Sequence, residues 1–207
     1  MTLVYLFIGI FASFLGALPL GASNIAVINT TLKQNANQAF KIAIAAGIAE
    51  VILSFYALHC NTEVQSFIDN NMWIQVVIVL ILLSVGAILF FKKEKKKEYK
   101  RKSLVKSKYL TGFLLGILNP PVLIYWIVAI GFLNKSDFGL SLQSSSLVLF
   151  LFFSGIYIGK LLTLYLYSKF SIVLKNRVHN INQAINKVTG VLLVVIAVFQ
   201  VVKLYAF

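Results

Sequence analysis

Two ionisable side chains stand inside long apolar runs of this sequence. Glu50 interrupts the run 39–60, and Lys160 interrupts the run 146–168. Inside a membrane such a group costs at least about 2.5 kcal/mol, and by default it faces the interior of the helix bundle and has a function. We expect Glu50 to bind a proton or a solute ammonium, and Lys160 to neutralise Glu50 or to hold a carboxylate. The alternatives are a purely structural Glu50–Lys160 ion pair and a Lys160 that extends to the lipid headgroups.

All three prolines fall in two similar stretches, 15–24 and 115–121. In each stretch a Leu-Gly pair leads to Leu and then Pro, with an Asn close by. Proline removes a backbone donor and clashes with the preceding turn, so each stretch should interrupt its helix. Backbone freed at membrane depth is tolerated only where protein or a water-filled cavity covers it. Two such breaks in corresponding halves of a chain indicate the binding site of a transporter.

The half-helices that follow Pro19 and Pro120 are expected to direct free N–H groups at the middle of the membrane, where they suit a carboxylate. Side chains near the breaks could add hydrogen bonds. Alternatively, the prolines only kink the helices and the asparagines cap freed backbone groups. The expected solute-binding residues are Pro19, Gly21, Asn24, Asn119, Pro120 and Lys160, with Glu50 as the proton-coupling residue.

The composition indicates an integral membrane protein. Of the 207 residues, 59% are hydrophobic and 12% are charged, whereas a soluble domain carries about 25% charged residues. The net charge of +13 could indicate a nucleic-acid partner, but ten of the nineteen Lys and Arg residues lie between positions 92 and 108. We therefore expect no nucleic-acid partner, and membrane lipid is the natural contact of this basic run.

A bilayer is crossed by about 20 apolar residues, and the sequence contains six such runs. The predicted spans are 3–31, 39–60, 72–91, 109–133, 146–168 and 188–206. The first, third and fifth connections carry sixteen Lys and Arg residues, against two on the opposite side. Because basic residues concentrate on the cytoplasmic side, both termini are expected outside a bacterial inner membrane.

Three spans per half would invert the second half relative to the first. Counted along their helices, Pro19 and Pro120 both lie roughly 17–20 Å from the cytoplasmic end, near the middle of the membrane. This depth suits an inverted repeat around a central site. We therefore predict an all-α integral membrane protein of six transmembrane helices in two inverted three-helix repeats, with helices one and four broken. The repeats are 1–91 and 109–207, joined by a basic cytoplasmic loop at 92–108.

No catalytic or metal-binding motif occurs in the sequence. There is no Cys/His cluster and no HExxH, GxSxG or GxxxxGK[ST]. His59 and His179 are expected near opposite faces of the membrane, so they could not share a metal ion. We expect no enzyme activity, no catalytic residue, no cofactor and no metal site.

Several segments resemble the LysE/RhtB family of bacterial amino-acid exporters. The broken first helix, with Pro19 and Gly21, is similar to a Pro-Gly-Pro-like motif of the family. Ala45 and Glu50 stand where the family has a Gly and then an acid. The remaining similar segments are Phe113–Pro120, with its Asn-Pro, and Ile185–Gly190, which resembles the family's Ile-Asn-Lys/Arg-x-x-Gly.

This resemblance implies export of amino acids or related small zwitterionic or cationic solutes, driven by proton antiport. The expected partners are then the solute, protons and membrane lipid, and a homo-oligomer is compatible with the sequence. Two other functions stay open. One is metal-ion export, which the shortage of His, Cys and acidic side chains disfavours. The other is a non-transporting scaffold whose basic loop binds anionic lipid or a soluble partner.

Overall fold

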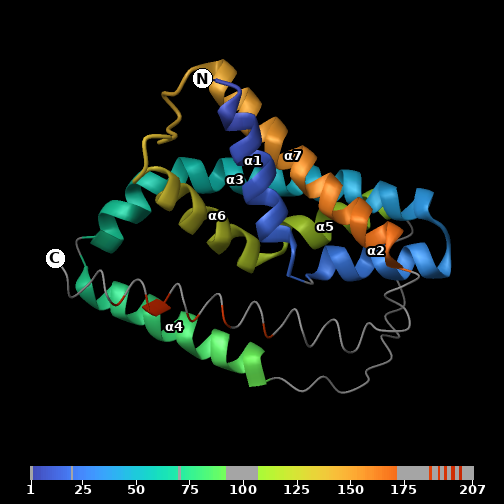
Figure 1. The fold of residues 1–207 in the computed structure, drawn as a ribbon, viewed down its shortest axis with the longest axis horizontal. Helices are drawn as coiled ribbons and strands as arrows, with labels where there is room; N and C mark the ends of the chain where they lie inside the picture. The colour runs from blue at the N-terminus through green and yellow to red at the C-terminus, as the bar shows by residue number, and fades with distance from the viewer. Residues whose placement is uncertain are drawn as a thin grey trace. The chain divides into compact units, whose positions relative to one another are not determined.

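The computed structural model describes residues 2–19, 21–69, 71–91 and 107–171, together with a few single positions between 187 and 201. Its elements are helices (Figure 1). They are α1 (Val4–Ala17), α2 (Ala22–Lys33), α3 (Ala36–Asp69), α4 (Met72–Phe91), α5 (Lys108–Ile117), α6 (Pro120–Leu133) and α7 (Ser146–Lys169). The all-helical prediction is confirmed for this part of the chain. The sixth predicted span and most of the basic loop lie outside the described residues.

Two of the described helices are long and apolar enough to cross a membrane: α3 over Ala36–Asn61, and α7. The number rises to four when each of two bent helix pairs counts as one span. The third predicted span, 72–91, coincides with α4. These lengths and compositions are those of a multi-pass membrane protein.

Both predicted helix breaks are present. The axes of α1 and α2 differ by 77° and those of α5 and α6 by 56°. The first break contains Pro19, as well as Leu20, which lies outside the described residues. In the second, Pro120 and Pro121 occupy the first positions of α6, where a missing N–H costs no helical hydrogen bond.

Helix α3 is longer than predicted. We expected a polar connection over residues 61–71, but the helix continues to Asp69. The segment 61–69 contains neither Pro nor Gly, so no residue in it interrupts the backbone hydrogen bonds of the helix. The polar residues after position 60 end the apolar part of α3, but the helix itself continues through them.

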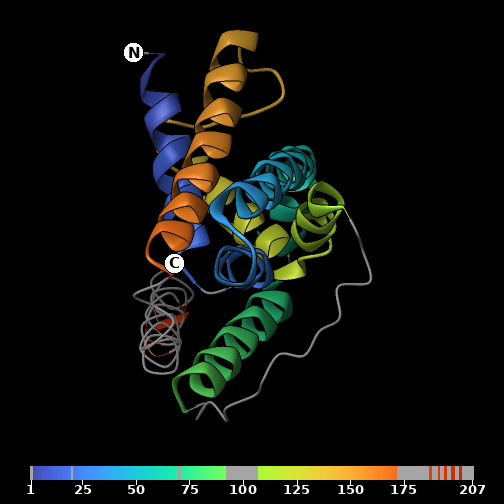
Figure 2. The ribbon, with the colours of Figure 1, turned by 90° about the vertical axis from the view of Figure 1, so that its right-hand side faces the viewer.

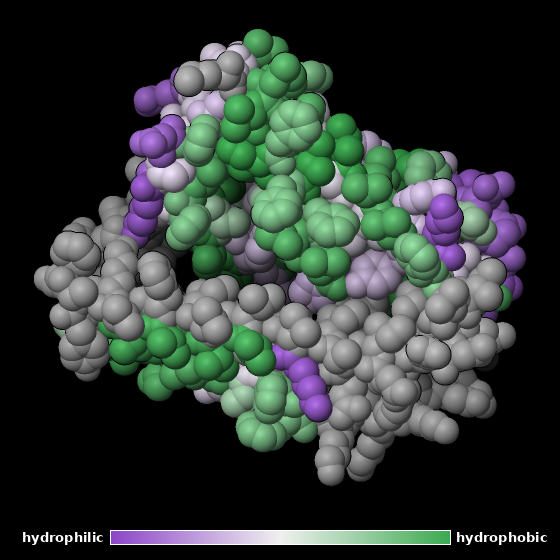
Figure 3. Space-filling view, in the orientation of Figure 1, coloured by the Kyte–Doolittle hydropathy of each residue, from purple (hydrophilic) through white to green (hydrophobic). Residues whose placement is uncertain are grey.

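The described residues divide into two compact units. The larger comprises residues 1–62 and 101–176, and the smaller comprises residues 63–100 and 177–207. In the larger unit α1 packs along α7, as both Figure 1 and Figure 2 show. On the face seen in Figure 3, hydrophobic side chains cover α1 and α7, and hydrophilic side chains gather where α2 meets α3.

Glycines allow the helices of the larger unit to approach backbone to backbone. A Cβ added at Gly9 of α1 would collide with the carbonyl oxygen of Phe152 in α7, and one at Gly155 would collide with that of Leu6. Helix α5 approaches α3 in the same way, since a Cβ at Gly112 would collide with the carbonyl oxygen of Ile42. Small residues at such positions are typical of helix contacts in membranes, where close packing replaces the hydrophobic drive.

Gly155→Ala should therefore destabilise the larger unit. The added methyl meets the backbone of α1 at Leu6 and Ile10, which cannot move aside as a flexible side chain would. We expect a loss of about 1–3 kcal/mol, the usual cost of overpacking, measured by unfolding in mixed detergent micelles. The matched control is Gly139→Ala, whose Cβ would have its nearest neighbours 3.8 Å away. An equal effect of both substitutions would contradict this account of α1 and α7.

Candidate functional site

The two intramembrane charges predicted from the sequence meet as an ion pair. Nζ of Lys160 lies 2.6 Å from Oε2 of Glu50. Glu50 comes from α3 and is 3% exposed, and Lys160 comes from α7 and is 5% exposed. A pair this buried is stable only if its geometry is good and the remaining lone pairs are satisfied. The alternative in which Lys160 extends to the lipid headgroups does not describe this structure.

Ser13 of α1 completes the site. Its Oγ donates a hydrogen bond of 2.8 Å to Oε1 of Glu50, and the side chain is fully buried. Both carboxylate oxygens of Glu50 therefore have a partner, one on α1 and the other on α7. The carboxylate holds three helices together at one point.

Small residues beside the pair permit this convergence. A Cβ added at Gly159 would lie 3.0 Å from Cβ of Ser13, so α7 can approach α1 closely one residue before Lys160. On the other side of α3, a Cβ added at Gly116 of α5 would lie 2.6 Å from Cβ of Ala49. The end of α5 therefore lies beside the turn of α3 that carries Glu50.

The carbonyl groups freed at the first break are satisfied by side chains. Nδ2 of Asn24 donates to the carbonyl oxygens of Ala17 and Pro19, at 2.7 and 3.0 Å. The hydroxyl of Tyr167 donates to the carbonyl oxygen of Leu18 at 2.5 Å. Capping of freed backbone, the alternative reading of the asparagines, is what Asn24 does in this structure.

The two breaks lie next to each other. A Cβ added at Gly21 would have Nδ2 of Asn119 as its nearest neighbour, at 3.9 Å. Segments separated by almost a hundred residues thus meet beside α2, as an arrangement of two broken helices around one site requires. The structure brings Glu50 together with Lys160, and Gly21 together with Asn119, and it places Pro19 and Pro120 in the breaks themselves.

The prediction of free N–H groups at the second break is wrong. Pro120 and Pro121 have no N–H, and the N–H groups of Val122 and Leu123 both donate to the carbonyl oxygen of Asn119, at 3.0 and 3.5 Å. A proline pair at the start of α6 therefore removes the donors that an anion would use.

The first break differs from the second. Among the described residues, none accepts a hydrogen bond from the backbone N–H groups of Ala22, Ser23 and Asn24 at the start of α2. A helix end of this kind can bind an anion. Of the two breaks, only the first therefore has the free N–H groups that were predicted to suit a carboxylate.

The sequence profile of LysE type translocators matches residues 14–204. The chain belongs to the LysE type translocator family. It is therefore a membrane transporter for a small molecule, and the resemblance found in the sequence is confirmed. No curated protein and no solved structure gives a significant match.

Sequence reasoning missed three residues of this LysE type site: Ser13, Tyr125 and Tyr167. The sequence contained a signal for Ser13, because Ser13 and Tyr5 carry the two hydroxyl groups of α1 and Ser13 lies near the middle of that apolar helix. Tyr125 of α6 packs its ring on Gly16 and donates to the carbonyl oxygen of Ala12 at 2.6 Å. Neither tyrosine stands out among the nine of the chain. Among the described residues, no group of three His, Cys, Asp or Glu side chains could hold a metal ion.

Ser13→Ala should destabilise the translocator more than a matched serine substitution. It removes a hydrogen bond to a buried carboxylate, a kind of bond that contributes about 1.5–3 kcal/mol. The control is Ser54→Ala in α3, because Ser54 is also fully buried but donates only to the carbonyl oxygen of Val51 in its own helix. Unfolding in mixed micelles measures both. A larger loss for Ser54→Ala would contradict the importance of the Ser13–Glu50 bond.

Proposed function

We propose that this translocator exports a small zwitterionic or cationic solute, such as an amino acid, by proton antiport, with Glu50 as the carboxylate that binds solute and proton in turn. The observation that carries this proposal is the buried contact between Glu50 and Lys160 at 2.6 Å, with Ser13 on the second carboxylate oxygen. Intramembrane ionisable pairs of this kind mark ion and substrate pathways.

The chemistry of the pair favours a zwitterion as the solute. An ammonium group of the solute can replace Nζ of Lys160 at Glu50, and the solute's carboxylate can then neutralise the displaced Lys160. Each buried charge has a partner as long as the solute is bound, which avoids the cost of several kcal/mol that an unpaired ion would carry. The N-terminus of α2, beside Gly21 and Asn119, offers a second place for the carboxylate.

Proton coupling follows from the same carboxylate. A proton that binds Glu50 from outside removes its negative charge, so that the solute ammonium loses its partner and leaves. When the proton leaves on the inner side, the carboxylate is again free to bind Lys160 or the next solute. One proton therefore enters for each solute that departs.

We further propose that the chain consists of two inverted repeats, 1–91 and 109–207, in a bacterial inner membrane with both termini outside. A repeated contact supports the repeats. Gly9 faces the backbone of Phe152, and Gly112 faces that of Ile42, so a helix of one half packs on the second helix of the other half twice. The glycines are 103 positions apart and their partners 110, the same separation as that of Glu50 and Lys160. The concentration of basic residues supports the orientation.

Glu50→Gln should abolish solute efflux driven by a pH gradient. Amide replaces carboxylate, so neither a proton nor an ammonium can bind as proposed. Proteoliposomes loaded with a mixture of amino acids, with efflux followed by mass spectrometry, test this without a prior choice of solute. Wild-type efflux from the variant at equal incorporation would refute the role of Glu50.

A double variant separates transport from stability. Glu50→Gln leaves Lys160 buried without its anion, which should cost about 3–5 kcal/mol. Adding Lys160→Met replaces the stranded ammonium with an apolar side chain of similar length, so Glu50→Gln/Lys160→Met should regain stability without regaining efflux. If the double variant regained efflux, the loss in Glu50→Gln would reflect misfolding, and the proposed exchange at Glu50 would be wrong.

A further inference from the structure

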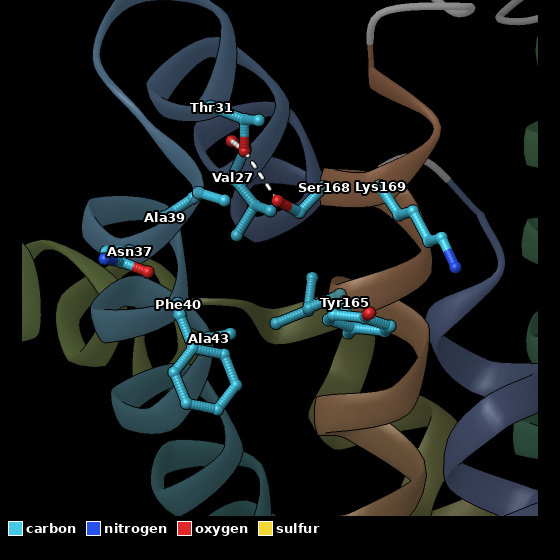
Figure 4. A pocket seen from close by; sticks show the side chains of 11 residues that line it. Val27, Thr31, Asn37, Ala39, Phe40, Ala43, Tyr165, Ser168 and Lys169 are labelled. Atoms are coloured by element: carbon cyan, nitrogen blue, oxygen red, sulfur yellow. Dashed lines mark hydrogen bonds between the residues drawn. The ribbon is translucent and has the colours of Figure 1, made fainter.

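A cavity of about 480 Å³ lies in the larger unit between α2, the first turns of α3 and the last turns of α7. Phe40 of α3 and Tyr165 of α7 stand on opposite sides of it (Figure 4). Between α2 and α7 the hydroxyls of Thr31 and Ser168 form a hydrogen bond of 2.8 Å. The middle of the wall is apolar, and its polar side chains lie close to the helix ends.

The cavity and the Glu50–Lys160 pair lie along the same two helices. Ala43 on the cavity wall is seven residues before Glu50 in α3, and Leu164 on the wall is four residues after Lys160 in α7. At 1.5 Å per residue these separations are about 10 and 6 Å along the helix axes. The cavity therefore approaches the ion pair from the end of the helices where α2 meets α3 and α7 ends.

Toward the other end of α3 and α7 lie a buried cluster and a second hollow. The buried cluster consists of Ala57, Leu58, Trp126, Ile130, Leu140, Phe152 and Ile156. The hollow, of about 610 Å³, lies between α3 and α7, and most of its wall is apolar, including Ile48, Ile52 and Phe150, which are exposed on the outer surface.

Two amide side chains link the helices at that end. Nδ2 of Asn61 donates to the carbonyl oxygen of Ile127, and Oδ1 of Asn61 accepts from Nδ2 of Asn134, both at 3.1 Å. In the described part of the chain, the cavity with polar side chains at its ends is thus on one side of the pair, and the packed cluster, with the apolar surface hollow beside it, is on the other.

A thin apolar layer separates the cavity from the ion pair. Val27 of α2, Ala46 of α3 and Leu164 of α7 belong to one buried cluster. Ala46 lies on the face of α3 that carries Ala43 and Glu50, one turn before the carboxylate. Val27 and Leu164 also line the cavity, so they are the members of this cluster in α2 and α7 that face it.

We propose that the cavity is a water-filled vestibule through which the solute reaches Glu50 and Lys160, and that Val27 and Leu164 are its closing side chains. The inference rests on the proposed function, because it supplies the path to the pair. The hydroxyls of Thr31 and Ser168, with Asn37 at the rim, provide the polar partners that water in an otherwise apolar cavity needs. An acyl chain of a lipid is the competing occupant.

Cysteine labelling distinguishes water from lipid. Cys60, the single cysteine of the chain, is replaced by Ser, and Ala43→Cys and Ser168→Cys are made in that background. A charged, membrane-impermeant methanethiosulfonate reacts with thiolates, which form in water. It is added in turn to each face of vesicles that contain the protein.

The matched control is Leu162→Cys. Leu162 lies seven residues from the end of α7 and Ala43 seven from the start of α3, so both are about 10 Å from their helix ends. Leu162 is 44% exposed and outside the cavity wall, whereas Ala43 is 1% exposed and lines it.

We expect the thiols at 43 and 168 to react about a hundredfold faster than the thiol at 162, from one face only. Exposure to lipid alone would give the reverse order for 43 and 162. Unreactive thiols at both 43 and 168 in folded protein would show that lipid or side chains fill the cavity, and the vestibule would be refuted.

The closing role of Val27 and Leu164 has a separate test. A thiol from Ala46→Cys should be unreactive, because Ala46 packs in the buried cluster with Leu164 and, unlike Ala43, does not line the cavity. Adding Leu164→Ala should raise its labelling rate about tenfold or more by admitting water, while Leu162→Ala on the outer face of α7 should not. An unchanged rate in the Leu164→Ala background would overturn the assignment of the closing side chains.

These measurements do not depend on transport. Labelled thiols at 43 and 168 together with normal efflux in Glu50→Gln would leave a water-filled cavity and refute the role of Glu50. Unlabelled thiols together with abolished efflux in Glu50→Gln would refute the vestibule alone.

Discussion

A carboxylate and an ammonium inside an apolar helix bundle are stable only while they are paired, and the rest of the larger unit follows from that constraint. Glu50 and Lys160 reach each other because α3, α7 and α1 approach more closely than large side chains would allow. Gly155 and Gly159 on α7 remove the side chains that would hold α1 away. The small residues therefore allow the helices to approach closely enough for the ion pair to form. The ion pair in turn fixes the register of the three helices.

The two breaks look alike in sequence but differ in hydrogen bonding. At the first, Asn24 and Tyr167 satisfy the freed carbonyls, while no described residue accepts from the first N–H groups of α2. At the second, the Pro120–Pro121 pair removes the donors and Asn119 accepts from the next two. Among the described groups, positive charge is therefore found at Lys160 and at the start of α2, whereas the start of α6 offers no free donor.

The sequence predicted those features of the structure that follow directly from a single residue type. Proline predicted both helix breaks, and the position of Glu50 and Lys160 inside apolar runs marked them as candidate site residues. Pairing of Glu50 with Lys160 was one of several alternatives, and the sequence could not select it because pairing depends on how α3 and α7 rotate about their axes. Tyr125 and Tyr167 escaped notice because only the tertiary fold places a hydroxyl opposite a particular carbonyl. The extension of α3 to Asp69 was missed because a change of polarity was taken as a helix end.

The two ends of the α3–α7 pair differ in how tightly their side chains pack. One end has alanines at 39, 43 and 46 and a cavity, and the other has the packed cluster around Trp126. Within the described residues, Nε1 of Trp126 is buried without an acceptor, which costs about 1–3 kcal/mol. Opening that end would expose apolar surface but would hydrate this donor. The packed end is thus less stable than its packing alone would make it.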